Sequence, residues 1–111
     1  MLALENALNA RLLHVTTDDH RDRAADQLAD AVAKARSAWG HSQVVDNEAR
    51  ETPDATQRLL QERDELRREC AHWIAQAKRL HLERRINEPW HEWAPKAFGW
   101  SYTTIKQRLR T

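Results

Sequence analysis

The chain has 111 residues, of which 41% are apolar and 32% are charged, with only two glycines and three prolines. This composition predicts an all-α fold, and the length suffices for one small domain or two helical pieces. A single cysteine excludes an intramolecular disulfide, and no apolar run approaches the length of a membrane span, so we expect a cytoplasmic protein without a membrane partner.

Charge is distributed unevenly, although the formal net charge is only +1. Residues 1–56 contain six Lys and Arg against ten Asp and Glu, whereas residues 57–111 contain twelve against seven. An acidic body with a basic end is typical of a protein that faces phosphate groups. The alternative is that the charges of the two halves pair with each other.

The first helix is expected over residues 2–14, where Leu4, Leu8 and Leu12 recur every four residues. The β-branched run Val15-Thr16-Thr17 then predicts a break, after which Thr16 or Thr17 can cap a second helix. Aspartates at 18 and 19 suit the positive end of that helix dipole.

The second helix is expected over residues 18–39, with an alanine-rich apolar stripe and Gly40 as its C-cap. The polar segment 41–51 shows no helical period and is interpreted as a loop. Residues 1–52 are therefore predicted to form a helical hairpin and a loop that serve oligomerisation or partner binding.

A long helix is predicted within residues 53–87, starting at Thr52-Pro53-Asp54, where a hydroxyl, a first-turn proline and an acid coincide. Pro89 limits its end, because the residue before a proline disfavours the helical conformation. Heptad spacing assigns it a seam of large residues alternating with small ones: Leu59, Leu66, Cys70, Trp73, Ala77 and Leu80. We expect this coiled-coil seam to join two chains as a homodimer, although the same pattern suits packing within one chain.

The last segment, residues 88–111, is rich in aromatic side chains and basic residues. Pro89 opens a helix that carries Trp90 and Trp93, Gly99 marks a tight turn, and Ser101 is a good N-cap for a final helix over 101–110. From Trp93 to the end the sequence contains four cations and no carboxylate. Trp93, Phe98 and Trp100 are expected in a core, whereas Trp90 and Tyr102 are candidates for contact with a partner.

This order of residues resembles the helix-turn-helix DNA-binding family. The matching residues are Phe98-Gly99-Trp100-Ser101, followed by Thr104-Ile105 and Leu109, within the last 20 to 40 residues. The resemblance implies a C-terminal three-helix unit whose last helix enters the major groove of double-stranded DNA. The sequence departs from the family at Pro95, where a small residue such as alanine is usual, so we expect a kink or a restart of the first helix there.

The resemblance and the basic face together predict a DNA contact set of Lys96, Ser101, Tyr102, Thr103, Lys106, Gln107, Arg108 and Arg110. Lys96, Arg108 and Ser101 are expected at phosphates, the last through the amides at the helix start, and Thr103 and Gln107 at base edges. The predicted function is a small dimeric DNA-binding protein, a transcriptional regulator or accessory protein of a phage or other mobile element.

The sequence shows only weak signals for a metal site or for catalysis. Cys70 and His72 point in different directions on a helix and have no completing ligands, so no metal or cofactor is expected. The sequence contains no glycine-rich phosphate loop and no catalytic triad order, so we expect no enzyme. The alternative function is a helical inhibitor or adaptor that binds a protein partner through its Trp-rich end or its leucine seam.

Overall fold

The computed structural model describes the backbone of residues 2–110 and the side chains of residues 25–110. The described residues form helices joined by short turns, without strands, in the order α1 (Leu2–Glu51), the 3₁₀ turn η1 (Pro53–Ala55), α2 (Thr56–Glu83), α3 (Trp90–Phe98) and α4 (Tyr102–Leu109). The all-α prediction is thereby confirmed. The molecule is elongated, with principal extents of 71 × 33 × 17 Å.

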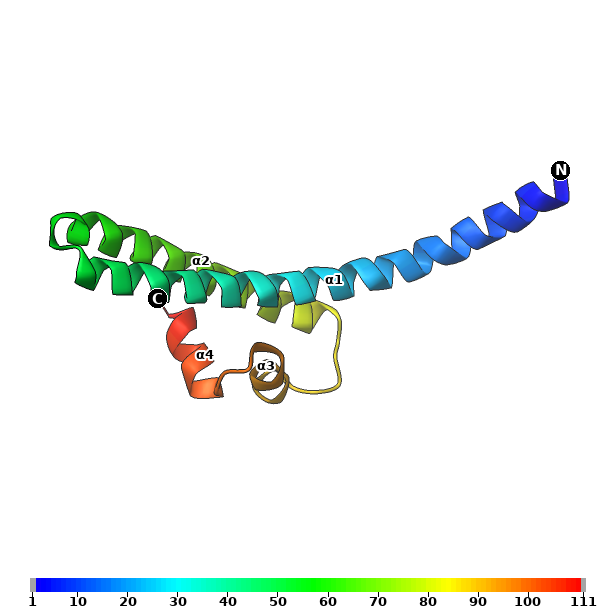
Figure 1. The fold of residues 1–111 in the computed structure, drawn as a ribbon. Helices are drawn as coiled ribbons and strands as arrows, with labels where there is room; N and C mark the ends of the chain where they lie inside the picture. The colour runs from blue at the N-terminus through cyan, green and yellow to red at the C-terminus, as the bar shows by residue number, and fades with distance from the viewer. Residues whose placement is uncertain (1, 111) are drawn as a thin grey trace.

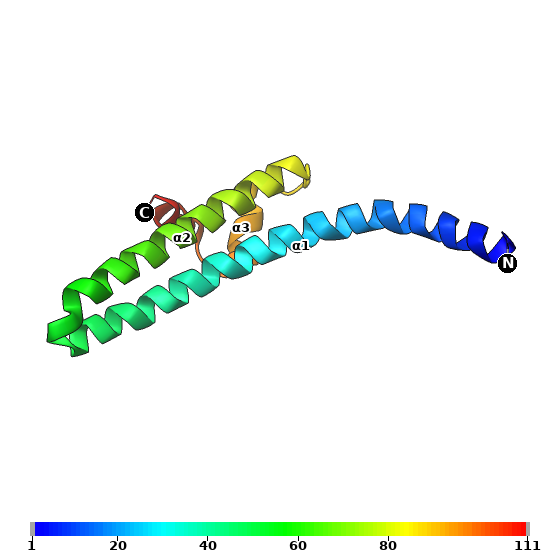
Figure 2. The ribbon, with the colours of Figure 1, turned by 90° about the horizontal axis from the view of Figure 1, so that it is seen from above.

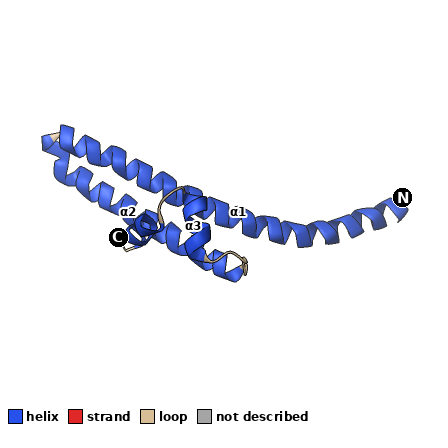
Figure 3. Ribbon diagram, turned by 90° about the horizontal axis from the view of Figure 1, so that it is seen from below, coloured by secondary structure: helices blue, strands red, loops and turns tan. Residues whose placement is uncertain are grey.

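Helices α1 and α2 form one long antiparallel hairpin, and α3 and α4 pack on one side of it (Figure 1). Viewed at right angles, the amino-terminal part of α1 extends past the end of α2 with no other helix beside it (Figure 2). From below, α3 crosses the hairpin (Figure 3), and α4 also packs against α2. The two short helices are therefore held by the hairpin as well as by each other.

The break predicted at residues 15–17 is wrong, because α1 is one continuous helix of 50 residues. Three β-branched residues each lower helix propensity by only about 0.5 kcal/mol, which is too little to end a helix. Gly40 also lies inside α1 and is exposed, rather than forming a C-cap. The expected short N-terminal hairpin is thus replaced by a single helix, and the side chains of Leu4, Leu8 and Leu12 lie outside the described residues.

The loop predicted over residues 41–51 is also wrong, because this segment is the last part of α1. Its helical period is hard to recognise in the sequence because polar residues occupy some of the buried positions. Ser42, Val45, Asp46 and Ala49 are all buried against α2 at spacings of one, three and four residues. The Ser42 hydroxyl donates to a main-chain carbonyl one turn back, and Asp46 accepts from Arg63 of α2 at 2.6 Å. These bonds allow polar side chains to occupy positions where an apolar residue is expected.

The turn between the two long helices contains the predicted proline start, but a different threonine supplies the side-chain hydrogen bonds. Pro53 occupies the first position of η1, while the Thr52 side chain makes no capping bond. Thr56 instead donates its hydroxyl to the carbonyls of Ala49 and Thr52, at 3.0 and 3.1 Å. This hydroxyl links the last turn of α1 to the first turn of α2.

The seam expected to join two chains is covered within one chain. Cys70 and Ala77 are fully buried in a core shared with α1, and Trp73 and Leu80 pack against that core. Leu59 and Leu66 belong to a second cluster near the turn, with Val45 of α1. The physical reason is that α1 supplies a facing row of small residues, so the large seam residues pack there without a second copy.

Helices α3 and α4 add aromatic and branched residues to the same core. Trp90, Ala94, Phe98 and Ile105 are buried together with residues of α1 and α2. Helix α3 continues through Pro95, so the expected restart at this residue is not observed. The proline lies within the second turn, where only one main-chain bond is lost, and the Gly99 amide donates to its carbonyl at 2.9 Å.

Candidate nucleic-acid interface on α4

The turn between α3 and α4 has the local geometry that its residues favour. Gly99 has φ +70°, a left-handed conformation that residues with a Cβ rarely adopt. Ser101 is in extended conformation, and its hydroxyl oxygen accepts from the Thr104 amide at 3.2 Å while donating to the Thr104 hydroxyl at 2.8 Å. Ser101 therefore caps α4, and the Thr104 amide is already occupied by this cap.

Helix α4 has a buried face and an exposed face. Ile105 is fully buried, and Leu109 packs against the core from the next turn. The opposite side carries Thr103, Lys106, Gln107 and Arg110, all exposed; Gln107 has a polar or ring contact of its own. The carboxyl end of α4 lies near the hairpin, and its amino end points away from it (Figure 1). The exposed face is therefore accessible along the length of the helix.

Arg108 is not on that exposed face. Its guanidinium lies between two indole rings, 3.9 Å from the centroid of Trp39 in α1 and 4.3 Å from that of Trp100. Arg67 of α2 approaches the Trp39 ring at 4.9 Å, and its Nε is buried without a hydrogen-bond partner among the described residues. Burial is the main cause that lowers the pKa of Arg108, with a smaller contribution from Arg67. Arg108 thus packs α4 onto α1, away from the exposed face that carries Lys106 and Arg110.

The position of Arg108 beside the buried face of α4 can be read from its spacing to the apolar residues of that helix. It lies three residues after the buried Ile105 and one before Leu109, which places it at the edge of the apolar side of the helix. The contact between Arg108 and Trp39 was not predicted, because the two residues lie far apart in the sequence.

The remaining predicted contacts are distributed over two environments. Lys96 is exposed, but it forms an ion pair with Glu88, whose hydrogen bond raises the pKa of the lysine. The Lys106 ammonium lies 5.0 Å from the ring of Tyr102, and that ring is half-buried near His91. Lys96 therefore pairs with a carboxylate that precedes α3, whereas Lys106 lies on the open face of α4.

Buried titratable groups lie beneath α3 and α4 without forming a recognisable reaction centre. Cys70 is fully buried, and burial raises the pKa of its thiol to about 11. His81 packs edge-on to Trp90, and both ring nitrogens are buried without a partner among the described residues. Within the described side chains, no three His, Cys, Asp or Glu residues come together in a way that would hold a metal ion.

In the part of the chain that the structure describes, no helix has an apolar stretch long enough to cross a membrane.

Comparisons with known proteins do not add a function. No protein-family model matches the sequence, and neither a curated protein nor a solved structure matches the chain.

Proposed function

We propose that the protein binds double-stranded DNA through the exposed face of α4. The observation that carries this proposal is an open helical face with Lys106 and Arg110 four residues apart and Thr103 and Gln107 beside them. The sequence from Trp93 to the end contains no carboxylate that would repel a phosphate. Cations on an accessible helix give sequence-independent attraction, and the neighbouring polar side chains suit contacts with base edges.

The roles within this face follow from side-chain chemistry. Lys106 and Arg110 contact phosphates, while Gln107 and Thr103 are positioned to meet bases in the major groove. The amino end of α4 points away from the hairpin, which leaves it free to approach a groove (Figure 1). Arg108 and Ser101 act indirectly by fixing the helix, through the tryptophan contacts and the N-cap respectively.

A single short helix provides few contacts, so tight binding requires two copies that contact neighbouring half-sites about one DNA turn apart. The function that fits this arrangement is a small transcriptional regulator or an accessory protein of a phage or other mobile element. The α2 seam is used within the chain, so a second copy must associate through another surface.

The test is a fluorescence-anisotropy titration of a random-sequence duplex over a range of salt concentrations. We expect a steep loss of affinity with salt, because each phosphate contact releases counterions. Lys106→Glu should weaken binding at least about tenfold, whereas Lys106→Ala should reduce the salt slope by about one.

Arg79→Glu is a matched control for the charge reversal. Arg79 is exposed on α2 and lines a hollow with Trp73 instead of facing α4. This variant should leave affinity within about twofold of wild type, since the reversed charge lies away from the proposed DNA contacts. Absence of binding at low salt, or equal losses in both variants, would refute the proposal.

The alternative function is a helical module that binds another protein. The surfaces first considered for it are largely used internally, since Trp90 is buried and the α2 seam is covered. One apolar groove between α1 and α3 favours it instead. The salt series distinguishes the two functions, because a protein adaptor has no reason to bind a random duplex even at low salt.

A further inference from the structure

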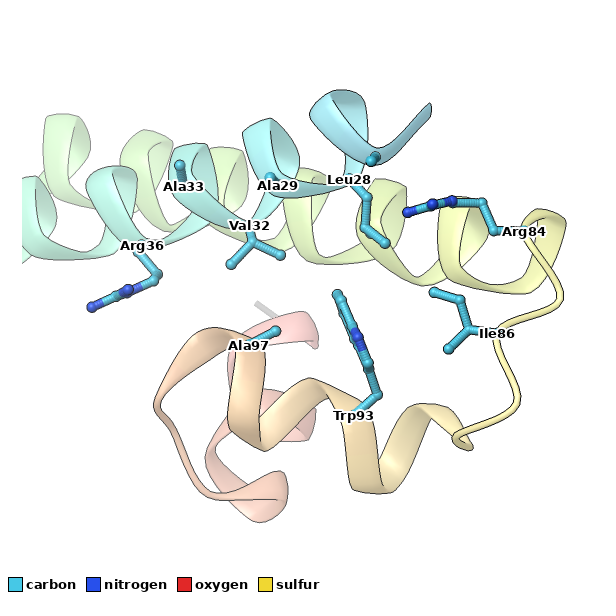
Figure 4. Close-up of a pocket in the computed structure, with 10 residues that line it drawn as sticks. Leu28, Ala29, Val32, Ala33, Arg36, Arg84, Ile86, Trp93 and Ala97 are labelled. Atoms are coloured by element: carbon cyan, nitrogen blue, oxygen red, sulfur yellow. The ribbon is translucent and has the colours of Figure 1, made fainter. Parts of the chain in front are cut away.

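An apolar groove runs along the outer side of α1 and is bounded by α3 and by the segment that follows α2 (Figure 4). Its volume is about 410 Å³. Trp93 and Ile86 point into it opposite Leu28 and Val32 (Figure 4). The α1 side of the lining also includes three small residues at four-residue intervals: Ala25, Ala29 and Ala33. Small residues in this spacing allow the backbone of a second helix to approach closely.

Two arginines stand at the groove without carboxylate partners among the described side chains. Arg84 lies beside Leu28, at the end nearer the amino terminus of α1, and Arg36 lies at the other end (Figure 4). A second shallow hollow continues the lining past Arg36 to Ser37 and Gly40 of α1 and to Trp100. The shape fits a helix that lies along α1, and the charges require that helix to be acidic.

We propose that the occupant of this groove is α1 of a second copy of the chain, packed antiparallel to the first. The groove-facing positions 25, 29, 32 and 36 continue towards the amino terminus through positions 22, 21 and 18, within a stretch, residues 18–26, that contains four aspartates and two arginines and is therefore acidic. Positions 18 and 22 lie in the part of α1 that extends past the hairpin with no helix beside it (Figure 2). Most helical stability in proteins comes from tertiary packing, so contact with a second copy would stabilise this part of α1.

The antiparallel register is self-complementary. A twofold axis beside Gln27 places Ala25 opposite Ala29 of the second copy and Arg36 opposite position 18 of the second copy. The exposed Asp26 of the second copy then lies at the end of the groove that Arg84 occupies. Each contact occurs twice, as an isologous interface requires.

This inference does not rest on DNA binding, because it is tested with the full chain in the absence of DNA. Sedimentation equilibrium should show a monomer–dimer equilibrium. Ala29→Arg should raise the dimer dissociation constant by on the order of a hundredfold or more, since it places two bulky, unpaired charges at the centre of the interface. Ala75→Arg, at an exposed alanine of α2 outside the groove, is the matched control and should leave the constant unchanged.

A charge exchange tests the register. Arg36→Asp should weaken the dimer roughly tenfold, because two symmetry-related pairs are lost. Adding Asp18→Arg to the same chain should restore the wild-type constant. Circular dichroism checks that the helical content of every variant is retained. A monomeric wild-type protein, a dimer insensitive to Ala29→Arg, or a charge exchange that fails to restore it would overturn the proposal.

Discussion

Arg108 offers a quantitative test of how the short helices are fixed to the hairpin. Replacing it with alanine removes two cation–aromatic contacts, at 3.9 Å from the Trp39 ring centroid and 4.3 Å from that of Trp100. Each contact at such a partly exposed site contributes about 0.5–1 kcal/mol, and the buried part of the side-chain stem adds about 1 kcal/mol. Loss of repulsion from Arg67 offsets a part of this cost.

We therefore expect Arg108→Ala to lower the free energy of unfolding by about 2 kcal/mol. For a chain of this length, about 4 °C per kcal/mol is a reasonable conversion, so the midpoint should fall by about 8 °C. Urea and thermal unfolding followed by circular dichroism provide both quantities. Arg108→Lys keeps the charge but lacks the planar guanidinium that stacks on both rings, so it should recover less than half of the loss.

The Arg108→Ala variant also tests whether Arg108 only holds α4 on the hairpin or also contacts DNA. Below its unfolding midpoint, Arg108→Ala should keep the salt slope of wild type, because Arg108 does not lie on the open face of α4. A loss of stability under about 0.5 kcal/mol, or a lysine variant equal to wild type, would show that the stacked arginine does not hold α4. A smaller salt dependence of DNA binding in this variant would instead show that Arg108 contacts a phosphate.

Three further predictions concern the hairpin and the turn between α3 and α4. The hydrogen bond from Arg63, aided by the charge of Arg50, holds the pKa of Asp46 below its ordinary value of 3.8, whereas burial opposes this shift. The stabilisation is thus present above about pH 4 and is lost as pH falls, so the difference in urea stability between wild type and Asp46→Asn should shrink on acidification. Gly40→Ala should stabilise α1 by about 0.5–1 kcal/mol in the same assay, since the added Cβ meets no atom within 4 Å. Gly99→Ala, equally unhindered but at φ +70°, should destabilise, and two variants of equal sign would contradict this reasoning.

Local signals placed the carboxyl-terminal half of the chain well. Prolines at 53 and 89, Gly99 and the Ser101 cap mark the ends of α2, α3 and α4 close to where the structure has them. These residues act through their own backbone conformation or one nearby hydrogen bond, so no knowledge of tertiary contacts is needed. The buried side of α4 followed in the same way from Ile105 and Leu109.

The loop over residues 41–51 was predicted wrongly because polar side chains occupy part of the buried row of α1, and their burial depends on α2. That row recurs at three- and four-residue spacings, and its members are Leu28, Ala31, Ala35, Ala38, Ser42, Val45 and Ala49. The sequence indicates an alanine-rich stripe only over residues 18–39, and beyond it the polar residues Ser42 and Asp46 interrupt the apolar period. These positions are buried because Arg63 and the core residues of α2 pack against α1, and all of these residues lie far away in the sequence.

The heptad seam of α2 shows a second limit of prediction from sequence. The seam indicates that α2 packs against a helix with small residues, but not whether that helix belongs to the same chain or to a second copy. Alanines occur on two sides of α1, and only one side can face α2. Ala31, Ala35 and Ala38 are buried there, which leaves Ala29 and Ala33 exposed on the groove side. Alanine is a good helix former, so exposure alone does not require a partner. The combination of exposed alanines, a facing tryptophan and two arginines that have no carboxylate partner among residues 25–110 does favour one, because packing by an acidic second helix would satisfy all three features at once.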